Sequence, residues 1–160
     1  MGVDRHGSVI ELFTDGSSLG NPGPGGYGLV LRQGKHRKEL SAGFRRTTNN
    51  RMELLAVIVG LEALKRPGIE VVVTSDSRYV VDAVSKGWVF NWEKKGLEKK
   101  SNPDLWRRSL KIYRQHNVRF VWIRGHTGHP ENERCDRLAV AAAQADDLPA
   151  DEAYEKANPA

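Results

Sequence analysis

Two short β-branched segments, residues 69–74 and 118–123, each follow a stretch with the apolar spacing of an amphipathic helix. The clearer of these stretches is residues 50–65, and Pro67-Gly68 ends it. A strand that is reached through a helix returns parallel to an earlier strand of the same sheet. Residues 69–74 are also apolar enough to be buried on both faces, as in a sheet that helices cover. The chain therefore predicts an α/β fold.

The N-terminal third of the chain predicts strands. β-Branched and aromatic residues at 9–14, 27–32 and 38–46 favour three strands, and the Gly/Pro-rich residues 20–28 predict the first turn between them. Strands joined by short turns pair antiparallel. The segment forms a meander that adds antiparallel strands to the parallel ones that follow.

The remaining segments complete one domain. Further helices are predicted at residues 77–86, 103–116 and 132–145, which gives the order βββαβααβα. This order predicts a five-stranded mixed sheet with helices on its faces, within a single domain over residues 8–145. Residues 146–160 are expected to form an acidic, loose C-terminal tail.

The charge of the chain is unevenly distributed. The net charge is +5, but residues 144–160 carry five acidic residues against one lysine, which leaves +9 on residues 1–143. A basic body suits a polyanion such as nucleic acid or an anionic membrane surface. Charge alone does not choose between them.

The chain shows no signal for export or membrane insertion. Its single cysteine, Cys135, excludes an intramolecular disulfide and favours a reducing compartment. The longest apolar run, residues 54–61, is far shorter than a transmembrane helix, and no signal peptide begins the chain. We expect a cytoplasmic monomer without a membrane partner.

Four carboxylates stand where predicted strands end or predicted helices begin. Asp15 and Asp76 close two strands, and Glu53 and Asp136 fall in the first turns of two helices. Each alone fits a turn or a helix cap. If the fold gathers them, their mutual repulsion requires a cation, and oxygen ligands select Mg²⁺ or Mn²⁺. A carboxylate site in a basic domain indicates phosphoryl chemistry on nucleic acid.

The segment 125–130 contains the closest pair of histidines, His126 and His129. Together with Cys135 they are conceivable zinc ligands, but no HExxH or CxxC spacing accompanies them. Beside Asp136, a loop imidazole could move protons near neutral pH. A structural role bonded to the backbone fits this sequence equally well.

Residues 86–100 mix five lysines with three aromatic residues and two glutamates. Trp88 and Trp92 fit core anchors for short helices. Beside Lys94 and Lys95, they also fit a surface that neutralises phosphates and packs on sugars or bases. Both roles remain open on the sequence.

Five motifs follow one another along the chain: FTDGS at 13–17, NPGPGGYG at 21–28, TTNNRME at 47–53, TSDS at 74–77 and GHTGHPENERCD at 125–136. In this set and order they resemble bacterial type 1 ribonuclease H over residues 8–145. Each motif carries an acidic, asparagine or histidine residue at a place where the family has one. The resemblance is therefore far more specific than any single motif.

The resemblance implies a ribonuclease H-like fold and an endonuclease that hydrolyses the RNA strand of RNA–DNA hybrids, leaving 5′-phosphate and 3′-hydroxyl ends. It implies that Asp15, Glu53, Asp76 and Asp136 hold two Mg²⁺ ions, with Asp15 bridging them and Mn²⁺ as a possible substitute. His126, but not His129, matches the residue for proton transfer or product release.

The resemblance also assigns substrate contacts. A pocket for a DNA-strand phosphate is matched by Asn21, Arg46 and Thr48, and minor-groove contacts are matched by Asn49 and Asn50. Asn132 matches a position that orients the site. The family's basic protrusion corresponds to residues 86–100, with Trp88, Trp92, Lys94 and Lys95 as its contacts.

Two departures from the family pattern concern affinity. The basic protrusion is a few residues shorter and is diluted by Glu93 and Glu98, and Arg78 replaces the usual Gln. The shorter and less basic protrusion is expected to lower the affinity for the hybrid. Arg78 is expected to add a phosphate contact. Neither departure touches the four carboxylates.

The alternative from another class is a non-catalytic nucleic-acid-binding module that keeps this fold. A second alternative is a nuclease of the same fold that acts on DNA, as integrases and junction resolvases do. All four acids are present, which disfavours the first alternative. The set Asn21, Thr48, Asn49 and Asn50 disfavours the second.

Overall fold

Five strands form one mixed sheet with the order β3-β2-β1-β4-β5. The computed structural model describes residues 9–125 and 128–160. Its strands are β1 Ile10–Ser18, β2 Gly23–Gln33, β3 His36–Thr47, β4 Glu70–Ser75 and β5 Asn117–Trp122. The first three pair antiparallel, whereas β1, β4 and β5 run parallel. The predicted mixed sheet is confirmed, and the predicted strands and helices follow one another in the predicted order. The structure adds helices at Trp88–Lys95 and Glu152–Ala157 and a 3-10 turn at Leu97–Lys99, which the prediction lacked.

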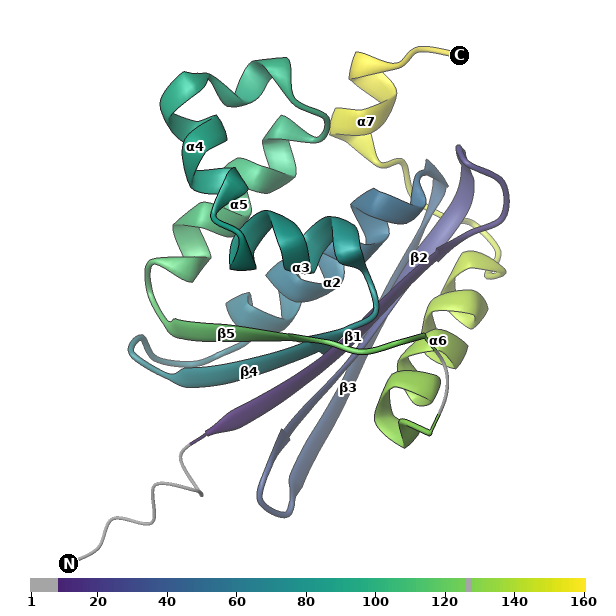
Figure 1. Ribbon diagram of the computed structural model, residues 1–160. Coiled ribbons are helices and arrows are strands. Elements are labelled where there is room, and N and C mark those ends of the chain that lie inside the picture. The colour runs from purple at the N-terminus through teal and green to yellow at the C-terminus, as the bar shows by residue number, and fades with distance from the viewer. Residues whose placement is uncertain (1–8, 126–127) are drawn as a thin grey trace, which may run out of the picture.

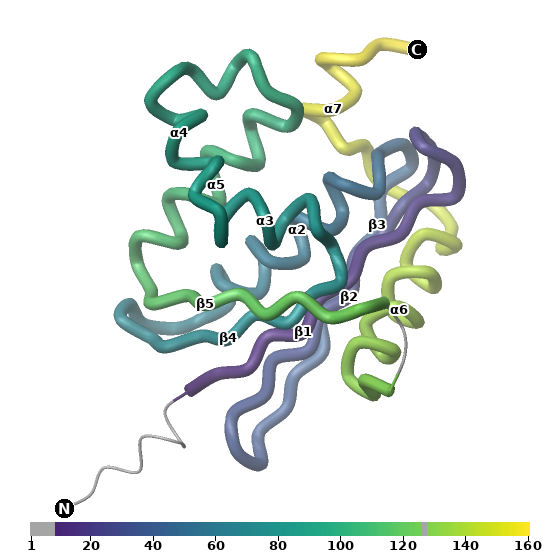
Figure 2. Tube along the Cα trace, viewed as in Figure 1, coloured from purple at the N-terminus to yellow at the C-terminus, as the bar shows by residue number. Residues whose placement is uncertain are grey.

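Helices cover both faces of this sheet (Figures 1 and 2). Helix α2 packs on β1 and β2 with α3 and α5 beside it, and α6 crosses β1, β2 and β3 on the opposite face. The helices are α2 Asn49–Glu62, α3 Arg78–Ser85, α4 Trp88–Lys95, the 3-10 turn η1 Leu97–Lys99, α5 Pro103–Tyr113, α6 Pro130–Ala143 and α7 Glu152–Ala157.

The main core lies between the sheet and α2. Leu12 and Leu29 from the strands pack there with Leu54 and Ile58 from α2, and all four are fully buried. A smaller apolar cluster of Phe13, Val30 and Cys135 lies on the α6 face. Because side chains alternate along a strand, the two clusters use neighbouring residues of β1 and β2.

The glycine-rich segment predicted as a turn is largely strand. Strand β2 begins at Gly23, and only a short connection separates it from β1. The glycines are needed because α6 packs against the backbone. A Cβ at Gly26 would lie 2.6 Å from the Ala139 carbonyl oxygen, and one at Gly28 would lie 2.4 Å from that of Cys135. Strand pairing and helix packing override the turn preference of these residues.

The prediction of a loose tail is wrong for its ordered second half. Residues 152–157 form α7, and Asp151, which precedes it, is a buried residue with 8% of its surface exposed. Asp151 accepts hydrogen bonds from Thr47 Oγ1 and Arg51 Nε, both at 2.7 Å. Tethered in this way, the segment folds back along β3, where Glu155 pairs with Arg45 (Figure 1). The acidic residues of this segment therefore form ion pairs with the domain as well as contacts with solvent.

Among residues 9–125 and 128–160, no helix combines the length and the apolar character needed to cross a membrane.

Candidate active site

Asp15 lies within β1 rather than at its end. The strand continues to Ser18 because its pairing with β2 extends to Gly25. Side-chain alternation places Asp15 on the same face as Phe13, which is the α6 face. The backbone N–H of Gly16 donates to Asp15 Oδ1 at 2.9 Å and so fixes the carboxyl group.

Glu53 approaches Asp15 because residue 16 has no side chain. A Cβ on Gly16 would lie 2.4 Å from the Glu53 backbone nitrogen, so no larger residue fits between β1 and α2. The sequence placed Glu53 in the first turn of the helix, but in the structure it takes no part in the helix cap. Thr48 caps α2 by accepting from the Arg51 N–H, which leaves Glu53 one turn inside the helix and free to face the site.

Asp76 follows the end of β4, which runs parallel to β1. The register pairs Phe13 with Thr74, so Asp15 and Asp76 lie two residues farther along neighbouring strands at the same level. One carboxylate oxygen from each of Asp15, Glu53 and Asp76 falls within 4.8 Å of the others. The fold thus gathers three of the four predicted carboxylates into one group.

The clustering of these acids makes their charged forms costly. Burial, and then the negative charge of Asp76, raises the pKa of Asp15 to about 7. Burial, and then the charges of Asp15 and Asp76, raises the pKa of Glu53 well above its usual range. Three ionised carboxylates at this distance therefore repel one another unless a cation lies between them.

The residues present fit a divalent cation. Their donors are carboxylate oxygens alone, which hard cations prefer. Glu53 Oε1 is also buried without a hydrogen-bond partner in the described part of the chain, and a buried unpaired carboxylate oxygen is costly. A bound cation would satisfy this oxygen and relieve the repulsion at once.

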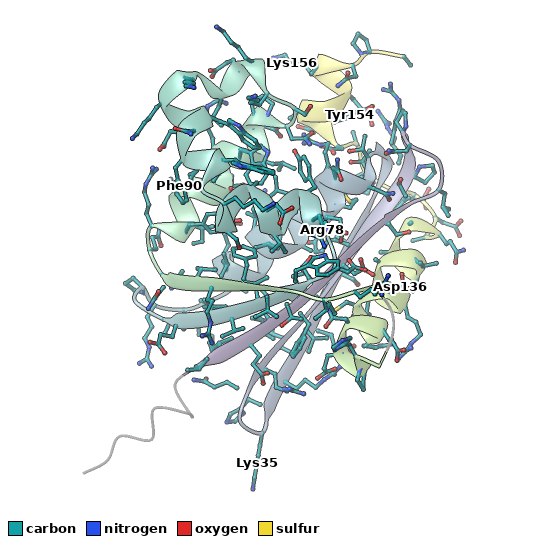
Figure 3. All side chains as sticks on the ribbon, in the orientation of Figure 1. Lys35, Arg78, Phe90, Asp136, Tyr154 and Lys156 are labelled. Atoms are coloured by element: carbon teal, nitrogen blue, oxygen red, sulfur yellow. The ribbon has the colours of Figure 1, made fainter. Side chains whose placement is uncertain are left out.

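Asp136 extends the acidic group from the α6 side. Its side chain lies outside the group of three, but its negative charge contributes to the raised pKa of Asp15. Asp136 lies in the second turn of α6 rather than the first, because the helix begins at Pro130 (Figure 3). Asn132 ties this helix to the sheet by donating from Nδ2 to the Thr74 carbonyl oxygen at 3.1 Å.

His126 lies outside the described residues. Of the other zinc ligands considered, His129 immediately precedes α6, whereas Cys135 is fully buried between Phe13 and Val30. Burial raises the pKa of the Cys135 thiol, so it is neither an exposed nor an ionised ligand. Within residues 9–125 and 128–160, the residues grouped closely enough to hold a metal are the three carboxylates.

Two of the three predicted phosphate-contact residues, Asn21 and Thr48, meet near the N-terminus of α2. Asn21 Oδ1 accepts from the Asn49 N–H at 3.1 Å. Asn21, Thr48 and Asn50 then line a cleft of about 670 Å³ that also includes Asn102. Sequence reasoning did not single out Asn102. A local signal was the Asn-Pro pair at the start of α5, where Asn102 adopts a left-handed conformation with φ of 59°.

Arg46, the third predicted phosphate-contact residue, is not among the residues that line this cleft and contacts the C-terminal segment instead. Its Nη1 donates to the Asn158 carbonyl oxygen at 2.7 Å, and its guanidinium lies 5.4 Å from the centre of the Tyr154 ring. The segment that was expected to be loose therefore covers a residue predicted to bind the substrate.

The structure separates the two tryptophans of residues 86–100. Trp92 packs edge-to-face on the buried Trp106, with ring centres 5.7 Å apart, and so anchors α4. Trp88 is exposed over 44% of its surface. Both line a cleft of about 400 Å³ together with Lys95, whereas Lys94 is exposed outside it. Trp92 thus combines a core role with a surface one.

Comparisons with known proteins agree with this architecture. The RNase H family model matches residues 7–144. The chain is 59% identical over 147 residues to a ribonuclease H from Desulforamulus reducens, an alignment that covers 89% of this chain and 92% of the relative.

Two solved structures are similar to this fold. LC9-RNase H1, described as a type 1 RNase H with the type 2 active-site motif, gives a TM-score of 0.77 at 36% identity, covering 85% of this chain and 72% of that one. LC11-RNase H1 in complex with an RNA/DNA hybrid gives a TM-score of 0.64 at 29% identity, and the alignment covers 84% of this chain and 96% of that one. With the family model spanning most of its length, this chain belongs to the RNase H family.

Proposed function

We propose that this protein is an endonuclease that hydrolyses the RNA strand of RNA–DNA hybrids and leaves 5′-phosphate and 3′-hydroxyl ends. The observation that carries the proposal is the convergence of Asp15, Glu53 and Asp76 within 4.8 Å in a chain of this family. The relatives named Ribonuclease H and the hybrid complex of LC11-RNase H1 support the substrate class.

Asp15, Glu53, Asp76 and Asp136 would hold two Mg²⁺ ions when the substrate is bound, and Mn²⁺ could replace them. Such ions lower the pKa of an attacking water and neutralise charge on the leaving 3′-oxygen. The four carboxylates would thereby fix where the scissile phosphate lies. His126 would accept or release a proton near the leaving group, and Asn132 would hold α6, and hence Asp136, against β4.

Hybrid selectivity would come from contacts on both strands. Asn21 and Thr48 would bind a phosphate of the DNA strand at the cleft beside α2. Arg46 would join them once its contact with the Asn158 carbonyl oxygen opens. Asn49 and Asn50 would contact the minor groove, where 2′-hydroxyl groups distinguish RNA from DNA. Exposed Trp88, the partly exposed Trp92 and the lysines Lys94 and Lys95 would pack on the DNA strand.

We further propose that residues 8–145 form the catalytic domain, with residues 86–100 as its basic protrusion, and that the protein acts as a cytoplasmic monomer. Residues 146–160 add contacts to this domain through Asp151 and α7.

The test is cleavage of end-labelled RNA paired with DNA, beside single-stranded RNA, duplex RNA and duplex DNA, with and without Mg²⁺. Asp15→Asn serves as the matched control because it preserves the shape of the side chain. Cleavage of the hybrid's RNA alone, dependent on Mg²⁺ and lost in the variant, is expected. Hybrid binding without cleavage in either Mg²⁺ or Mn²⁺ would instead establish a binding module.

A further inference from the structure

Arg78 and Trp122 form a stacked pair beside the carboxylates. The Arg78 guanidinium carbon lies 3.9 Å from the centre of the Trp122 ring. Arg78 begins α3 and Trp122 ends the edge strand β5, so the pair joins two elements that flank β4. Figure 3 labels Arg78 above the C-terminal half of β5, where α3 packs against this strand.

The ring of Trp122 is itself fixed to the active site. Its indole N–H donates to the backbone carbonyl oxygen of Asp76 at 3.0 Å. Asp76 is a member of the carboxylate group, and Arg78 follows it by two residues. The tryptophan therefore sets the position of the guanidinium relative to the carboxylates through one hydrogen bond and one stacking contact.

The stacked guanidinium keeps much of its hydrogen-bonding capacity. The Arg78 side chain is 63% exposed, and its ion pair with Asp82 is long, at 4.0 Å. Asp82 is also 3.7 Å from Lys86, so its charge is shared between two cations. Stacking uses a face of the planar guanidinium and leaves its N–H edge for a phosphate.

We propose that Trp122 is a positioning residue that holds Arg78 against a phosphate of the RNA strand next to the cleaved bond. This inference rests on the proposed function. The strand assignment follows from Asp76, because the carboxylate group marks where the cleaved RNA strand lies and Trp122 ties the stack to Asp76 itself. The predicted contacts of the DNA strand lie elsewhere, at the start of α2 and on α4.

The first experiment compares Arg78→Gln with Arg119→Gln. Arg119 is exposed on the same strand as Trp122 but, by side-chain alternation, on the opposite face, so it controls for the loss of one positive charge. Arg78→Gln should raise the KM for the hybrid roughly three- to tenfold with kcat nearly unchanged. The salt dependence of binding should lose about one unit of slope, as expected for one phosphate contact. Arg119→Gln should change neither quantity.

The role of Trp122 is tested by replacing it with side chains that keep or lose the aromatic face. Trp122→Leu removes the stacking face and should raise KM about as much as Arg78→Gln. Combining the two changes should add little, because they remove one shared contact. Trp122→Phe keeps an aromatic face but loses the indole N–H that fixes the ring, so its KM should lie between the values of the wild type and of Trp122→Leu. Equal effects of the Leu and Phe variants, or an effect of Trp122→Leu that adds fully to that of Arg78→Gln, would show a merely structural tryptophan and overturn the proposal.

The strand is identified with hybrids that carry a single uncharged methylphosphonate linkage. In the wild type, one linkage near the cut in the RNA strand should raise KM, and the Arg78→Gln variant should be insensitive to that linkage. Insensitivity that appears only for a DNA-strand linkage would overturn the assignment. If the wild type cuts hybrids and Arg78→Gln has the same KM and the same sensitivity to the linkage, the inference about Arg78 is refuted and the proposed function stands. A wild type that cuts none of the hybrids would refute the proposed function.

Discussion

Arg51 and Asp151 form a buried ion pair across 100 residues of sequence, with Arg51 Nε 2.7 Å from Asp151 Oδ2. Arg51 also donates to both carboxylate oxygens of Asp104, at 2.9 and 2.8 Å. One guanidinium thereby joins the start of α2, the start of α5 and the C-terminal segment. The Arg51 side chain is 4% exposed, so each partner compensates for its removal from water.

Asp151→Asn is expected to lower the free energy of unfolding by about 3 kcal/mol, because it leaves a buried guanidinium with one anionic partner instead of two. Urea denaturation monitored by circular dichroism measures the change. Glu152→Gln is the matched control, since Glu152 is exposed at the neighbouring position, and it should change stability by less than about 0.5 kcal/mol. Equal stability of the two variants would contradict this role of Asp151.

Asp15→Asn is expected to stabilise the metal-free protein at pH 7 by on the order of 2 kcal/mol, because it removes one charge from a crowded acidic group. The same change should lower hybrid cleavage by several orders of magnitude. Thermal unfolding in EDTA and the cleavage assay measure the two effects on the same sample. A destabilised variant would mean that Asp15 holds the fold together.

The stability of the metal-free wild type should fall as pH rises. The Asp15 carboxyl has an ordinary pKa of 3.8 and a folded-state pKa raised to about 7, so the folded state binds more protons than the unfolded state between these values. The contribution of this group is complete below pH 3.8 and is lost as pH rises through 7. Melting temperatures in EDTA from pH 4 to 8 should show the decline, with a weaker decline in Asp15→Asn.

Added Mg²⁺ should reverse this decline at pH 7 and above, because a cation compensates the ionised carboxylates. The rise in melting temperature should be absent or small in Glu53→Gln, which removes a ligand whose Oε1 has no hydrogen-bond partner among the described residues. An equal response of both proteins to Mg²⁺ would place the ion elsewhere.

Gly16→Ala is expected to impair both stability and cleavage. The new Cβ would lie 2.4 Å from the Glu53 backbone nitrogen and 2.6 Å from the Met52 carbonyl carbon, so the start of α2 must shift. A loss of roughly 2 kcal/mol in stability and a drop in kcat larger than the change in KM should follow. Wild-type stability and kcat would show that β1 and α2 separate without cost.

Removal of residues 152–160 should tighten hybrid binding two- to threefold, because it frees Arg46 from the Asn158 carbonyl and the Tyr154 ring. Fluorescence anisotropy with Asp15→Asn in the background, which prevents cleavage, measures the affinity. Weaker binding of the shortened chain would show that the segment contacts the substrate itself. Asp151 is kept in the shortened chain so that its ion pair remains.

Local patterns in the sequence were sufficient for the five strands, for helices α2, α3, α5 and α6 and for the family, but not for α4 or α7. The strand at 69–74 and the helix at 50–65 are encoded by nearby residues, and the structure confirms both with shifted ends, at Glu70–Ser75 and Asn49–Glu62. The motifs around Asp15 and Asp76 were also visible locally. What each carboxylate faces depends on packing, as the strand position of Asp15 and the second-turn positions of Glu53 and Asp136 show.

The tertiary structure decided the contacts between distant segments. Acidic residues after position 145 predicted a solvated tail, because the default state of a surface carboxylate is exposure, yet Asp151 is buried against Arg51. The glycines of β2 predicted a turn because turns favour glycine locally. Their actual role, a backbone without side chains, is required by α6, which lies more than 100 residues later in the sequence. Local propensity describes what a segment prefers alone, whereas burial and charge compensation depend on the partners that the complete fold brings to it.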